Sequence, residues 1–88
     1  MNHKHRVTLH ALFAHPISSN IDPKAVKSVL EELGAELSHG GHGHLAIKLN
    51  GVSHSLHDTP RSLSKDTVAA LRKFLEEAGV NPGRDFPL

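Results

Sequence analysis

The sequence predicts a small α+β domain built as a two-layer sandwich, and three observations lead to this prediction. Two stretches carry apolar residues at helical spacing, and three short stretches between them alternate apolar with polar residues. Two of the alternating stretches are joined by Asn50-Gly51, a strong signal for a tight β-hairpin. Helices and an antiparallel meander that each have one apolar face bury those faces by packing as two layers. A chain of 88 residues supplies one such core.

The first long helix is predicted to follow Asp22 and Pro23. Asp22 suits the N-cap position, and proline is favoured at the first helical position. Gly34 suits the end of the helix, because glycine readily adopts the left-handed conformation found there. One apolar stripe runs between these signals, at Val26, Val29, Leu30 and Leu33.

Helical spacing also occurs toward both ends of the chain. Leu9, Leu12 and Phe13 predict a short amphipathic helix over residues 6–14. Ser64 can cap a last helix, which Gly79 and Pro82 end. The buried residues of that helix are expected to be Val68, Leu71, Phe74, Leu75 and Ala78. We therefore expect an N-terminal extension over 1–21, the main domain over 22–80 and a flexible tail over 81–88.

The hairpin determines which side chains share a face of the sheet. With a two-residue turn, Leu49 faces Val52, and the pairs step outward until His44 faces His57. Because side chains alternate along a strand, the apolar face holds Leu45, Ile47, Leu49, Val52 and Leu56. The opposite, polar face holds His44, Lys48, Ser53, Ser55 and His57. His54 falls on the apolar face, where we expect a buried or edge histidine.

Composition restricts the function classes. The formal charge is only +1, whereas general nucleic-acid binders carry a larger excess of Lys and Arg. Tyrosine and tryptophan are absent, which disfavours base stacking on an aromatic platform. There is no cysteine for disulfides or thiolate ligands, and no apolar stretch approaches the length of a membrane span. We expect a cytoplasmic protein that does not enter membranes.

The nine histidines are the most unusual feature, and three of them lie within His39–His44. Histidine titrates near neutral pH, so the opposed His44 and His57 can act as general base and general acid on RNA, which carries its own 2′-OH nucleophile. Lys48 can offset the negative charge that develops. The same pair can instead ligate zinc or nickel, with His39 and His42 as further ligands. A Gly-rich loop with histidines is also often only a solvated loop.

Two stretches resemble the HicA toxins of bacterial toxin–antitoxin pairs. They are "AVKSVLEELGAELSHGGHGHLAI" and "LSKDTVAALRKFLEEAGV", and the similarity covers residues 23–80. Gly34 matches the glycine that ends the family's first helix. Thr67-Val68 match the start of the family's last helix, and Ala78-Gly79 match its end. The family's essential histidine falls on His44, and its preceding Gly-Ser reads His42-Gly43 here.

The resemblance implies a double-stranded-RNA-binding-like α-β-β-β-α fold and metal-independent cleavage of mRNA. It further implies a HicB-type antitoxin as partner, covering the site. We expect His44 and His57 to be catalytic and Lys48, His42, Gly43 and Ser55 to contact RNA. No metal, no cofactor and no DNA binding by this chain alone are expected. The alternatives are a non-catalytic RNA- or partner-binding module of the same fold and a zinc- or nickel-binding protein.

Overall fold

The computed structural model describes residues 1–18, 20–57 and 62–88, without the side chain of His42. Its helices are α1 (His3–Leu12), α2 (Pro23–Glu32), the 3₁₀ turn η1 (Gly41–Gly43), α3 (Lys65–Glu77) and α4 (Pro82–Asp85). Its strands are β1 (Glu36–His39), β2 (His44–Leu49) and β3 (Val52–His57). The fold is therefore of the α+β class, as predicted.

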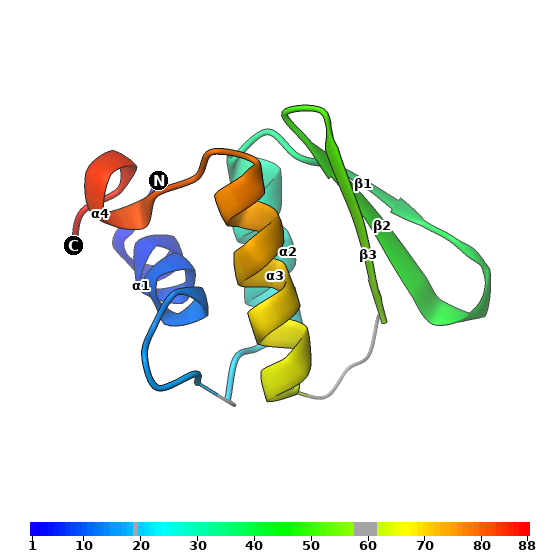
Figure 1. The fold of residues 1–88 in the computed structure, drawn as a ribbon, viewed down its shortest axis with the longest axis horizontal. Helices are drawn as coiled ribbons and strands as arrows, with labels where there is room; N and C mark the ends of the chain where they lie inside the picture. The colour runs from blue at the N-terminus through cyan, green and yellow to red at the C-terminus, as the bar shows by residue number, and fades with distance from the viewer. Residues whose placement is uncertain (19, 58–61) are drawn as a thin grey trace.

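The elements form three layers rather than the two expected (Figure 1). The antiparallel sheet is one outer layer, α2 and α3 form the middle layer, and α1 lies with α4 on the far side of those helices. Helix α1 packs against α2, α3 and α4. Leu9 and Leu12 of α1 are fully buried in the same apolar cluster as the residues of α2, α3 and β2. The N-terminal extension is thus part of the common core.

The predicted helix boundaries of the main domain agree closely with the structure. Asp22 caps α2 by accepting a hydrogen bond from the Lys24 amide, and Ser64 caps α3 by accepting one from the Thr67 amide. Gly34 and Gly79 follow the two helices with φ of +92° and +86°. Glycine is favoured at both positions because it has no Cβ to oppose a positive φ.

The sheet has the order β1-β2-β3 and the predicted hairpin register. Leu49 pairs with Val52, Ile47 with His54 and His44 with His57. Burial alternates strictly along β2, where Leu45, Ile47 and Leu49 are buried. The helices cover this apolar face, and the opposite face of the sheet stays uncovered in the described structure (Figure 1).

The C-terminal segment differs from the flexible tail expected over residues 81–88. Asn81 caps the short helix α4 by accepting a hydrogen bond from the Arg84 amide. The carbonyl of Phe86 accepts a hydrogen bond from His10 Nε2 over 2.8 Å, and its ring packs against the core. These contacts hold the segment against α1.

No helix within the described ranges is long and apolar enough to cross a membrane.

Candidate functional site

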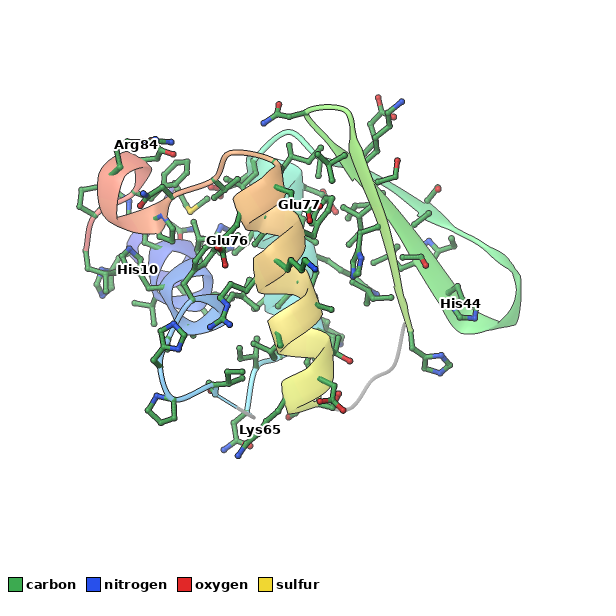
Figure 2. The ribbon with its side chains drawn as sticks, viewed as in Figure 1. His10, His44, Lys65, Glu76, Glu77 and Arg84 are labelled. Carbon is green, nitrogen blue, oxygen red and sulfur yellow. The ribbon has the colours of Figure 1, made fainter. Side chains whose placement is uncertain are left out.

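The candidate site is a pair of imidazole rings on the uncovered face of the sheet. The rings of His44 and His57 lie edge to face, with centroids 5.7 Å apart and planes at 88°. Both residues are exposed, and they close the end of the β2–β3 ladder that lies farthest from the hairpin turn. Figure 2 shows His44 at this end of the sheet. The structure therefore brings together the two residues predicted to be catalytic.

The tight turn at the other end of the hairpin positions this pair. Asn50 and Gly51 adopt φ of +51° and +81°, as a two-residue turn requires. The Asn50 side chain also donates a 2.7 Å hydrogen bond to the carbonyl of Ala78, just after α3. Because this turn determines the register, it also places His44 opposite His57.

The segment before His44 holds the first histidine of the pair in place. The Gly40 amide donates a 2.8 Å hydrogen bond to the His44 carbonyl, which joins the two ends of the loop containing η1. Gly43 has φ of +72° and enters β2 directly before His44. Gly43 is thus placed beside the pair, whereas the side chain of His42 lies outside the described structure.

Lys48 shares the face of the pair but does not adjoin it. It lies four residues from His44 along β2, which corresponds to about 13 Å between Cα atoms at the usual rise of a strand. Its direct neighbours across the ladder are Glu36 on β1 and Ser53 on β3. The predicted role of Lys48 beside the reacting groups of the pair does not fit this separation.

A shallow depression of about 630 Å³ lies on the sheet around Lys48, and its lining includes neither His44 nor His57. Its floor is a row of small side chains that runs across the three strands, Ser38, Ala46 and Ser55. Glu36, Lys48 and Ser53 line it on the side toward the hairpin turn. Ser55, predicted to contact RNA, lies in this floor two residues from His57.

The remaining histidines of the sheet are separate from the pair. His54 lies on the opposite face, where its ring stacks on Phe74 of α3 at a centroid distance of 5.4 Å. His39 pairs with Leu45, so the alternation places it on the face opposite His44. No group of three or more metal-binding side chains occurs among the described residues. His39, expected as a further metal ligand, does not join the pair.

The contribution of β1 to the site was not found from the sequence. Alternation over residues 35–39 does place Glu36 and Ser38 on one face. Their position opposite Lys48 and Ala46, however, depends on how the Gly-rich loop folds between β1 and β2. The length of that loop does not determine its backbone path, so the sequence does not provide the register.

The chain was compared with known protein families, with characterised proteins and with solved structures, and no match was found.

Proposed function

We propose that the protein binds RNA on the uncovered face of its sheet and cleaves it without a metal ion, with His44 and His57 as the acid–base pair. The observation that carries the proposal is the edge-to-face pair itself, two exposed imidazoles 5.7 Å apart on adjacent strands. At this separation both rings can reach different oxygens of one phosphodiester. RNA cleavage of this kind needs a base and an acid on the same phosphate.

The reaction that suits such a pair starts from the 2′-hydroxyl of the RNA. One imidazole removes the proton of the 2′-OH as the oxygen attacks the adjacent phosphorus atom. The other, protonated imidazole donates its proton to the 5′-oxygen as the P–O5′ bond breaks. The products are a strand that ends in a 2′,3′-cyclic phosphate and a strand that begins with a 5′-hydroxyl. The protons lost and gained by the two histidines balance over the step.

The resemblance to HicA toxins points to the same chemistry and adds a partner. The succession of α2, three antiparallel strands and α3 agrees with the double-stranded-RNA-binding-like order expected for that family. His44 is the position that the family motif and the cross-strand pairing share. We extend the proposal to mRNA as substrate in the cytoplasm and to a HicB-type antitoxin that covers the uncovered sheet face.

A specific observation also favours a second candidate, a module that binds RNA or a partner without cleaving it. The only described cation of the depression, Lys48, lies about 13 Å from His44 between Cα atoms. The acidic Glu36 stands beside it. A phosphorane between the imidazoles would therefore lack support from Lys48.

The chemistry of the products distinguishes the two candidates. Purified protein is incubated with a single-stranded RNA in excess EDTA, and with the same strand methylated at every 2′-oxygen. We expect cleavage of the RNA, 2′,3′-cyclic phosphate ends and no cleavage of the methylated strand. If the RNA stays intact, the function that remains is that of a module that binds RNA or a partner without cleaving it. Cleavage that EDTA abolishes, or that also cuts the methylated strand, would contradict the mechanism.

A further inference from the structure

Beyond the histidine pair, the uncovered sheet face carries a lysine at a distance that suits a second contact with the same strand. Lys48 is exposed and points from β2 to the same side as His44. The Cα atoms of Lys48 and His44 lie about 13 Å apart, and side chains on a strand stand roughly perpendicular to the sheet, so the ammonium group faces a different part of a bound strand than the imidazoles do. The small side chains of Ser38, Ala46 and Ser55 leave the intervening surface low and open.

We propose that Lys48 binds a phosphate that flanks the one at the histidines, and that Glu36 weakens this contact. The inference rests on the proposed function for its ligand, a single strand of RNA that crosses the depression along β2. A flexible lysine with three donors suits a phosphate oxygen whose position varies with the sequence of the bases. Lys48 is thus a positioning residue that holds the strand.

The role of Glu36 follows from the register of β1. It lies directly opposite Lys48, and paired positions on one face of a sheet have Cβ atoms about 5 Å apart. Its carboxylate offsets the charge of Lys48 in the free protein and repels an incoming phosphate. Such an arrangement limits affinity, which agrees with the low net charge of +1 of the whole chain.

The effect on binding can be measured without cleavage. A hexanucleotide RNA methylated at every 2′-oxygen lacks the nucleophile and serves as the probe. Its affinity for the full chain is measured over a series of salt concentrations. One phosphate contact on a single strand contributes about 0.7 to the slope of log K against log salt concentration. A lysine that only supports the fold would leave this slope unchanged.

Three variants that each change one charged side chain to glutamine make the test specific. We expect Lys48→Gln to weaken binding several-fold at low salt and to reduce the slope by about 0.7. Glu36→Gln should strengthen binding. Lys4→Gln is the matched control, because Lys4 is exposed on α1, in the layer farthest from the sheet. It should leave the slope unchanged.

The proposal is overturned if Lys48→Gln and Lys4→Gln have the same slope, or if Glu36→Gln weakens binding. It is also overturned if the wild-type chain does not bind the probe. Its failure differs from that of the catalytic proposal. If the wild type cleaves RNA but Lys48→Gln keeps the wild-type slope of log K against log salt concentration, only the proposed role of Lys48 fails. If Lys48→Gln reduces this slope but the wild type does not cleave RNA, only the catalytic proposal fails.

Discussion

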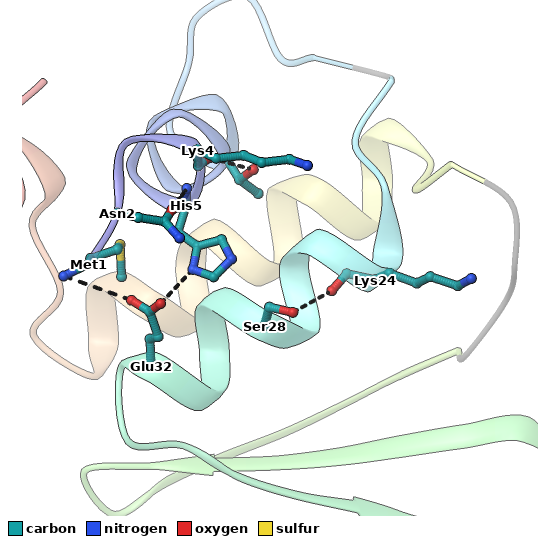
Figure 3. A network of polar contacts seen from close by, with 8 residues as sticks. Met1, Asn2, Lys4, His5, Lys24, Ser28 and Glu32 are labelled. Atoms are coloured by element: carbon teal, nitrogen blue, oxygen red, sulfur yellow. Dashed lines mark hydrogen bonds and ion pairs between the residues drawn. The ribbon is translucent and has the colours of Figure 1, made fainter.

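At the scale of single residues, histidines in this chain have two distinct roles. Several of them join elements of the fold, and His5 does so at the end of α2 (Figure 3). There His5 Nδ1 lies 2.6 Å from Glu32 Oε1, and the N-terminal ammonium lies 3.9 Å from the other oxygen of the same carboxylate. His10 holds the C-terminal segment and His54 stacks on α3, whereas His44 and His57 contact one another on an open surface.

The contact between Arg84 and Asp85 gives a prediction of pH dependence for α4. Two hydrogen bonds from the Arg84 guanidinium, at 2.8 and 3.0 Å, hold the pKa of Asp85 below its ordinary value of 3.8. A carboxyl whose pKa falls on folding stabilises the fold above its unfolded-state pKa. That contribution is lost as the pH falls through the lower folded-state pKa. We expect α4 to loosen only in this acidic range.

The side-chain carbon resonance of Asp85 reports this transition in an NMR titration. Arg84→Gln is expected to return the pKa of Asp85 toward its ordinary value, and the amide shifts of α4 should follow the same curve. A wild-type Asp85 that titrates at the ordinary pH of an aspartate, or a titration unaffected by Arg84→Gln, would show that the contact is not formed in solution.

At the scale of elements, the β2–β3 hairpin is the part of the fold that matters most for the site. Its two-residue turn defines the register, and the register places His44 beside His57. Asn50 supports the turn in two ways, by adopting φ of +51° and by donating its hydrogen bond to Ala78. Because that bond attaches the turn to the end of α3, it also orients the sheet against the helices.

Two substitutions of Asn50 separate these contributions to stability. Asn50→Gly keeps the freedom to adopt a positive φ but removes the hydrogen bond, and we expect it to lower the free energy of unfolding by about 1 kcal/mol. Asn50→Ala loses the bond and also opposes the positive φ, which costs about 1–2 kcal/mol more. Urea denaturation measures both. An Ala variant as stable as the Gly variant would argue against the left-handed turn.

At the scale of the whole molecule, the chain behaves as one packing unit in three layers. Leu9 of α1 and Leu71 and Leu75 of α3 are fully buried in a cluster that also includes the sheet residues Leu45 and Ile47. The sheet and α1 lie on opposite sides of the middle layer (Figure 1). Their stability is therefore expected to be coupled through α2 and α3.

Shortening a buried side chain of α1 tests this coupling. We expect Leu9→Ala to lower the free energy of unfolding by about 2–5 kcal/mol, because it leaves a cavity where the side chain is fully buried. Val7→Ala is the control, since Val7 is 45% exposed on the same helix. A Leu9→Ala variant that is as stable as Val7→Ala would show that α1 is not docked in solution.

The sequence predicts best those features that local chemistry determines. The caps at Asp22 and Ser64 and the turn at Asn50-Gly51 act within a few residues, so the bounds of the elements and the His44–His57 pairing follow from them. The four-residue spacing of Lys48 from His44 is also visible in the sequence. Alternation alone, however, groups residues by face and does not indicate their distance along it.

Features that depend on contacts between distant segments could not be predicted. The apolar spacing of Leu9 and Leu12 indicates that α1 packs, but not against which layer. The tail over residues 81–88 has little periodicity, and it is held by the contact of Phe86 with His10 of α1. The position of Glu36 opposite Lys48 depends on the path of a glycine-rich loop.

The proposed cleavage of RNA by His44 and His57 is tested by comparing single alanine variants in excess EDTA. His44→Ala and His57→Ala are each expected to reduce the cleavage rate by about 10²–10⁴-fold while keeping the stability of the fold. His54 lies on β3 like His57 but on the opposite face of the sheet. His54→Ala should therefore retain the wild-type rate once it is shown to be folded. Equal rates in all three variants and the wild type would contradict catalysis by His44 and His57.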